Sequence, residues 1–217
     1  MSRYNTVLRM DEEGVIYRQV VFTHQMIKVG EMGAKNRKEG INLMGAEESK
    51  RIAQSRAKSK VRDYVCTNKD LTTFVTYTLS PKKVEDRYDE KLIYKQVRNW
   101  LSDNVKRRDF KYVLVPEPHE DGAWHFHGFV NKDLDWKLGC RSATRIKRTR
   151  DRNKVIAYIT SYINKTGVKF NGRYYLHSNN LKDPTKIYDN VAYTSVEGGY
   201  EKALGFGGIG VKIVDFN

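Results

Sequence analysis

The stretch FKYVLVPEPHEDGAWHFHGFV, residues 110–130, decides the fold. Its two ends, 110–117 and 123–130, are rich in β-branched and aromatic residues, which is the composition of strands. Between them, "EDG" at 120–122 is typical of a turn. The pattern therefore predicts two antiparallel strands joined by a short connection.

The second of these strands carries two histidines on one face. Residues i and i+2 of a strand point the same way, so His125 and His127 project together. Glu117 ends the preceding strand, and the turn brings it back alongside. Two imidazoles and a carboxylate would suit Mn²⁺, or Mg²⁺ when a phosphate supplies oxygens. His119 or Glu120 could replace Glu117 as the third ligand, but we prefer Glu117 because it lies at the strand end.

The segments around this hairpin alternate between strand and helix patterns. "TTFVTYTLS" (72–80) predicts a strand, and 89–108 predicts an amphipathic helix. A further helix is predicted at 151–165 and a strand at 172–177. The order strand–helix–strand–strand–helix–strand predicts an α+β domain of ferredoxin-like or RRM-like type, with a central antiparallel sheet flanked by helices.

The flanking regions predict less regular structure. Residues 1–30 could form a strand or hairpin, 30–45 read as a glycine-punctuated loop, and 46–65 as a basic helix. That helix could follow a phosphate backbone or simply be solvated on its charged side. The expected organisation is an N-terminal extension, a core domain, and a glycine-rich C-terminal segment that could add a final strand: residues 1–70, 71–190 and 191–217.

The second predicted helix carries a possible nucleophile. Tyr158, Tyr162 and Lys165 are spaced so that they share one helix face. A tyrosine hydroxyl has a pKa of about 10 and is a poor nucleophile at neutral pH. A nearby cation favours the phenolate and can hold a phosphate, so Lys165 would assist. The alternative is that both tyrosines only pack against the core.

Composition points to a polyanionic partner. The net charge is +14, which favours nucleic acid first and an anionic membrane surface second. No segment approaches the length of a membrane span, and no signal peptide is recognised. Cys66 and Cys140 lie far apart in no known pattern, which indicates free thiols in a reducing compartment such as the cytoplasm.

The most basic segment lies between the histidines and the tyrosines. Residues 137–154 contain eight Lys or Arg and one acidic residue. Four of these side chains are candidates for contacts to DNA phosphates: Arg145, Lys147, Arg148 and Arg150. A solvated loop that becomes ordered on binding is equally consistent with this composition.

In combination, these motifs resemble the HUH endonucleases, specifically the rolling-circle replication initiators of phages and plasmids. "FVTYTLS" resembles the first motif of the family, "HFHG" matches the second, and "YITSYINK" is similar to the third. "GRYYLHSNNLKDP" resembles the stretch that follows the tyrosine motif. The resemblance covers roughly residues 70–185.

The resemblance implies an HUH endonuclease fold and a metal-dependent reaction on DNA. His125, His127 and Glu117 would bind Mg²⁺ or Mn²⁺. A tyrosine would attack one strand of a single-stranded or hairpin origin and remain linked to its 5′ end. Relatives with two tyrosines tend to have a lysine where this chain has Ser161, which favours Tyr162 as principal nucleophile and leaves Tyr158 to alternate with it or to pack.

The resemblance also implies partners. A host or separate helicase and a DNA polymerase would complete replication in the cytoplasm of a bacterial host, because the chain has no G-x-x-x-x-G-K-[ST] motif. Three alternatives stay open: a non-catalytic RRM-like nucleic-acid-binding module, an HUH transposase or relaxase, and a metal-dependent hydrolase that uses water.

Overall fold

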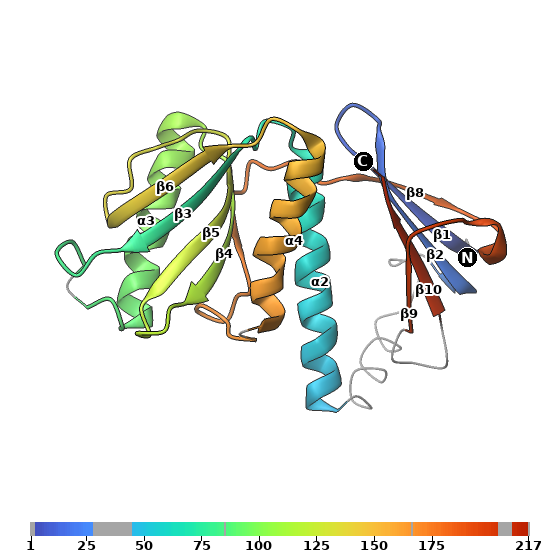
Figure 1. Cartoon of the computed structure of the whole chain (residues 1–217), viewed down its shortest axis with the longest axis horizontal. Coiled ribbons are helices and arrows are strands. Elements are labelled where there is room, and N and C mark those ends of the chain that lie inside the picture. The colour runs from blue at the N-terminus through green and yellow to red at the C-terminus, as the bar shows by residue number, and fades with distance from the viewer. Residues whose placement is uncertain (1–2, 28–44, 85, 166, 204–209, 217) are drawn as a thin grey trace. The chain divides into compact units, whose positions relative to one another are not determined.

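The computed structural model describes residues 3–27, 45–84, 86–165, 167–203 and 210–216 (Figure 1). They form two compact units. We call Gln54–Asp183 the central unit, and Met1–Ala53 together with Pro184–Asn217 the terminal unit. The chain is α+β, as predicted, and both of its sheets are antiparallel. Of the loop predicted at 30–45, residues 30–44 lie outside the described residues.

The central unit is built around a five-stranded sheet in the order β6-β3-β5-β4-β7. Its strands are β3 (Thr73–Leu79), β4 (Tyr112–Pro118), β5 (Trp124–Val130), β6 (Gly139–Arg145) and β7 (Leu176–His177). The hairpin predicted from residues 110–130 is present as β4 and β5, which pair with Glu117 opposite His125. This register brings the acidic and histidine positions to one end of the sheet.

Helix α3 (Glu90–Arg108) covers one face of this sheet. Its first turn is capped by Asp89, whose side chain accepts hydrogen bonds from the backbone of Lys91 and Leu92. Basic residues fill its last turn, where they complement the helix dipole. The helix packs its buried residues against the sheet to form the main core, which includes Ile93, Val97, Trp100, Leu101, Trp124, Phe126 and Trp136. The predicted apolar stripe is thus the core face of the helix.

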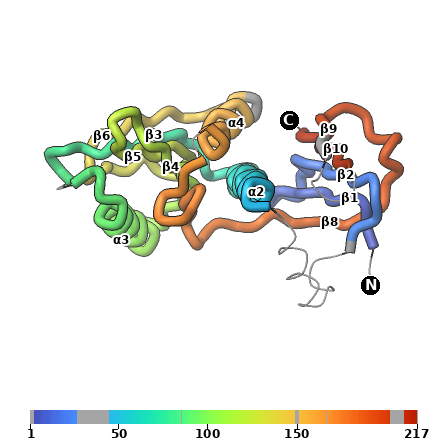
Figure 2. The backbone as a smooth tube through the Cα atoms, turned by 90° about the horizontal axis from the view of Figure 1, so that it is seen from below, coloured from blue at the N-terminus to red at the C-terminus, as the bar shows by residue number. Residues whose placement is uncertain are grey.

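Helix α4 (Thr149–Lys165) lies on the opposite face of the sheet (Figures 1 and 2). Tyr158 contacts Phe74 of β3 and His127 of β5, which alternate with the core residues of their strands. Helix α2 (Ala46–Thr67) runs beside α4, and Gln54 donates a hydrogen bond to the backbone carbonyl of Ile163. No helix in the described part of the chain is long and apolar enough to cross a membrane.

Two parts of the central unit differ from the prediction. Part of the basic segment at 137–154 is an edge strand, β6, although its polar sequence lacks a strand pattern; pairing with β3 along its whole length stabilises it. Only Leu176–His177 of the strand predicted at 172–177 pairs with β4. The residues before it form a tight turn, because Asn171 and Gly172 adopt positive φ of 45° and 76°.

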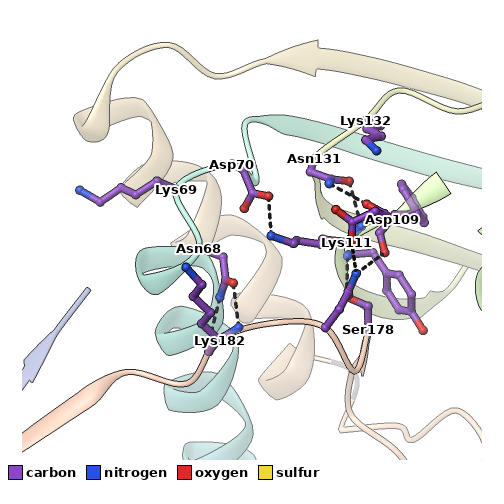
Figure 3. Close-up of polar contacts among 12 residues, drawn as sticks. Asn68, Lys69, Asp70, Asp109, Lys111, Asn131, Lys132, Ser178 and Lys182 are labelled. Carbon is purple, nitrogen blue, oxygen red and sulfur yellow. Dashed lines mark hydrogen bonds and ion pairs between the residues drawn. The ribbon is translucent and has the colours of Figure 1, made fainter. Parts of the chain in front are cut away.

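Polar side chains anchor the segment that follows β7 (Figure 3). The Asn68 amide donates to the backbone carbonyl of Lys182 at 3.0 Å and accepts from its backbone N–H at 2.9 Å. The Ser178 hydroxyl accepts from the backbone N–H of Tyr112, and Asn180 donates to the Asp109 carboxylate at 2.8 Å. The asparagine-rich stretch after the tyrosine motif is therefore held against the sheet edge.

The terminal unit joins both ends of the chain in a second sheet of order β8-β1-β2-β10-β9. Its strands are β1 (Arg3–Met10), β2 (Ile16–Ile27), β8 (Thr185–Asp189), β9 (Tyr200–Ala203) and β10 (Gly210–Asp215). A 3₁₀ turn, Tyr193–Ser195, lies between β8 and β9. The expected ranges 1–70, 71–190 and 191–217 were drawn from local pattern, whereas this unit depends on pairing between distant strands.

Candidate active site

The β4–β5 hairpin presents the polar residues of the site on the face covered by α4. Cross-strand pairing places Glu117 opposite His125 and Val115 opposite His127. Gly128 follows the second histidine because a side chain there has no room: an added Cβ would lie 1.9 Å from the backbone oxygen of Val113. The glycine of "HFHG" thus permits the close strand pairing that fixes the histidines.

His127 is the buried centre of the site. It is 7% exposed, and its Nδ1 lies 3.0 Å from Oγ1 of Thr76 on β3. Burial and the neighbouring His125 lower its pKa to about 4, so the imidazole is neutral at pH 7. Its Nε2 lies 2.9 Å from Oε2 of Glu117, yet the contact lacks hydrogen-bond geometry and Nε2 has no hydrogen-bond partner among the described residues. With the ring neutral, we read this as a close approach and not as an ion pair.

Glu117 sits between opposing influences. Burial raises the pKa of its carboxyl, while the positive charge of Lys165 and of a protonated His119 lowers it. Lys165, at the end of α4, thus acts electrostatically on Glu117.

His125 is turned toward the β4–β5 connection. Its ring stacks on His119 at 4.7 Å between centroids, and lies 6.2 Å from the ring of His127. His119 in turn contacts Asp121, which pairs with Arg87. Among the residues that the structure describes, no group of three His, Cys, Asp or Glu side chains is close enough to hold a metal ion. His119, a possible third ligand from sequence, instead packs against His125.

The two tyrosines of α4 lie against His127. The Tyr162 ring is stacked on the imidazole, with centroids 5.1 Å apart and planes 16° apart, and its hydroxyl donates a hydrogen bond to the Tyr158 hydroxyl. Tyr158 is 49% exposed and also contacts Phe74. Burial, the bond to Tyr158 and the charge of Glu117 raise the pKa of Tyr162. The sequence predicts a phenolate assisted by Lys165, but this arrangement favours the protonated phenol.

The predicted phosphate contacts lie beyond the end of β3. Arg145 ends β6, and it and Lys147 are exposed. Arg148 is also exposed and pairs with Asp151 at 3.0 Å. The side chain of Arg150 lies outside the described residues. Arg145 and Lys147 are therefore the exposed members of the set that form no ion pair with the residues described.

Sequence reasoning missed two residues that support the site. Thr76 lies in the "FVTYTLS" motif, but the motif alone gave no role to its hydroxyl. Arg152 belongs to the basic segment, yet its guanidinium donates to the backbone carbonyls of Val65, Lys69 and Leu71, which fixes the first turn of α4. The signal for Thr76 was its place in a motif; nothing local marked Arg152.

The positive charge is concentrated in the unit that carries this site. Residues 54–183 contain 28 Lys and Arg against 15 Asp and Glu, while the remaining residues contain 12 against 11. The central unit thus has a net charge of +13 and the terminal unit of +1. A polyanion is therefore attracted to the central unit.

Comparison with known proteins gives one match. A family model for replication-associated proteins of the ORF2 type matches residues 72–167, which are 96 of the 217 residues. No curated protein and no solved structure matches the chain. The matched segment contains Thr76, Glu117, both strand histidines and both helix tyrosines, and it supports a role for this chain in the initiation of replication.

Proposed function

We propose that this chain is a rolling-circle replication initiator of HUH type, which nicks and rejoins one DNA strand through a 5′-phosphotyrosine. The observation that carries the proposal is the stacking of Tyr162 on His127, with the Glu117 carboxylate beside the imidazole. A phenol on a helix and two metal-ligating groups on a hairpin would otherwise have no reason to meet. The family match over the same residues supports the proposal.

The residues of the site fit a divalent cation. His127 Nε2 is a buried nitrogen without a hydrogen-bond partner among the described residues, and Glu117 Oε2 is 2.9 Å away. Two neighbouring ligand atoms of an octahedral ion, each at about 2.1 Å from it, are separated by about 3 Å. We propose that Glu117 and His127 bind Mg²⁺ or Mn²⁺ and that His125 completes the set by leaving its stacked position on His119. A bound ion would polarise the scissile phosphate for attack.

In the proposed reaction, the Tyr162 hydroxyl oxygen attacks the phosphorus. The new bond joins tyrosine to the 5′ phosphate, the bond to the 3′ oxygen breaks, and that oxygen leaves and takes up a proton. Tyr162 must lose its own proton, and its hydrogen bond to the Tyr158 hydroxyl offers a path to water as Tyr158 releases a proton in turn. Lys165 would bind the phosphate backbone, and Tyr158 is the candidate acceptor for a second transfer.

The partners and place of action follow from the same proposal. The substrate is origin DNA, single-stranded or in a hairpin, and Arg145, Lys147, Arg148 and Arg150 would contact its phosphates. A host or separate helicase and a DNA polymerase would complete replication, in the cytoplasm of a bacterial host.

Mass-spectrometric mapping of a DNA-linked peptide tests the proposal. The protein is incubated with Mn²⁺ or Mg²⁺ and single-stranded origin DNA from the replicon that encodes it. A 5′-linked adduct on Tyr162 is expected, with none formed by Tyr162→Phe and normal amounts formed by Tyr94→Phe, a control on α3. Tyr158→Phe should permit the first cleavage and block any second transfer that uses Tyr158.

A non-catalytic nucleic-acid-binding module is the second candidate. The observation that favours it is that no three ligand side chains converge among the described residues. Binding without any adduct, in either metal, would favour this module. Cleavage that leaves free 5′ phosphates and survives loss of both tyrosines would instead favour a hydrolase that uses water.

A further inference from the structure

We propose that Thr76 is a positioning residue that selects the tautomer of His127, an inference that rests on the proposed metal site. The Thr76 hydroxyl lies 3.0 Å from Nδ1 of the imidazole. When Nδ1 carries the proton, it donates to Oγ1 and Nε2 keeps its lone pair. Nε2 is then the ligand atom, and it is the nitrogen beside Glu117.

The surroundings of His127 leave few other ways to fix the ring. Water has little access, because the side chain is 7% exposed. One ring face is covered by Tyr162, whose stacking restrains the ring plane but does not distinguish the two nitrogens. Nε2 has no hydrogen-bond partner in the part of the chain that the structure describes. The Thr76 hydroxyl is therefore the polar group that sets which nitrogen carries the proton.

The strand register explains why the hydroxyl must come from this position. Thr76 is paired with His127, and Thr78 with His125, so both threonines share the face of the histidines. In the described structure a hydrogen bond joins only the first pair, because His125 is turned toward His119. This contact assigns a chemical role to one residue of the "FVTYTLS" motif.

The test compares Thr76→Val with matched changes. Valine keeps the branched shape and the strand preference while it removes the hydroxyl. Thr76→Ser retains the hydroxyl, and Thr78→Val makes the same change two residues away on the same face. His127→Ala reports on the proposed metal site itself. Circular dichroism confirms that each variant is folded.

The first measurement needs no metal. Long-range ¹H–¹⁵N correlation spectra of the full-length protein in EDTA at pH 7 identify the protonated nitrogen of His127. We expect the Nδ1–H form in the wild type and in Thr76→Ser, and loss of that preference in Thr76→Val. A wild-type ring protonated on Nε2 would overturn the proposal.

The second measurement is Mn²⁺ affinity, from electron paramagnetic resonance of the free ion. Loss of such an outer contact costs about 10- to 100-fold in metal affinity. That loss is expected for Thr76→Val, while Thr76→Ser and Thr78→Val stay near wild type. If His127→Ala binds Mn²⁺ like the wild type, the proposed metal site fails. If His127→Ala abolishes binding while Thr76→Val alters neither affinity nor tautomer, the metal site stands and the role of Thr76 is refuted.

Discussion

Replacement of Arg152 should destabilise the tyrosine helix more than any other single change on its basic side. Its guanidinium donates to the backbone carbonyls of Val65 at 2.8 Å, Lys69 at 3.1 Å and Leu71 at 2.6 Å. It also lies 5.9 Å from the centre of the Phe129 ring. These acceptors are at and beyond the C-terminal turn of α2, where helix carbonyls lack partners within the helix.

The magnitude follows from these contacts. A hydrogen bond to a charged group contributes about 1.5–3 kcal/mol. Three such bonds share one guanidinium, and its release to water on unfolding offsets part of the sum, because burial already lowers the pKa of this group. We expect Arg152→Met, which keeps the side-chain stem, to lower the free energy of unfolding by about 3 kcal/mol. That loss corresponds to a fall in Tm of about 10 °C for a unit of this size.

Tryptophan fluorescence during urea and thermal unfolding measures this change selectively. All three tryptophans lie in the central unit, at positions 100, 124 and 136. Lys154→Met is the matched control, because Lys154 is exposed on the same helix, and its free energy of unfolding should change by less than about 0.5 kcal/mol. A loss below about 1 kcal/mol for Arg152→Met would refute the structural role assigned to these bonds.

Three further outcomes are expected. His127, with its pKa lowered to about 4, should stay neutral in metal-free protein down to pH 5 by NMR titration. Because the unfolded ring binds its proton near pH 6.5, the contribution of this group to stability is present above that pH and is lost as the pH falls toward 4; a midpoint near 6.5 in the folded protein would contradict this. Gly128→Ala should prevent folding of the central unit by circular dichroism, since the added carbon would meet the backbone of the neighbouring strand, whereas Gly45→Ala, with open space around it, should fold normally. Neutralising Arg145 and Lys147 together should reduce the slope of log K against log salt for single-stranded DNA by about 1.4, at about 0.7 per phosphate contact; an unchanged slope would remove both from the interface.

The local patterns of the sequence were sufficient for the parts of the fold nearest the site. The hairpin and the helix at 89–108 follow from strand composition, a turn signal and a helical apolar stripe, and each is present. Alternation on β5 also predicts which side of the strand is buried in the main core. Helix α4 formed despite its β-branched residues, because Ile156, Ile159 and Ile163 are buried. Packing there outweighs a weak intrinsic preference.

Long-range pairing could not be predicted from the same signals. Strand β6 is polar and exposed, and it exists because β3 offers a free edge. Strand β8 is paired with β1 across most of the chain length. No periodicity within either segment records its partner. The role of Arg152 is hidden for the same reason, because its acceptors are carbonyls more than 80 residues earlier.

The candidate site follows from two short repeats that meet in space. A spacing of two on β5 puts both histidines on one face, and a spacing of four on α4 puts both phenols on one face. Neither spacing predicts that Tyr162, the less exposed phenol, would be the one stacked on His127. Because this stacking and the charge of Glu117 favour a protonated Tyr162, the phenol needs help to lose its proton. A cation between Glu117 and His127 would cancel the carboxylate charge that raises the phenol pKa, so metal binding would prepare the nucleophile as well as the phosphate.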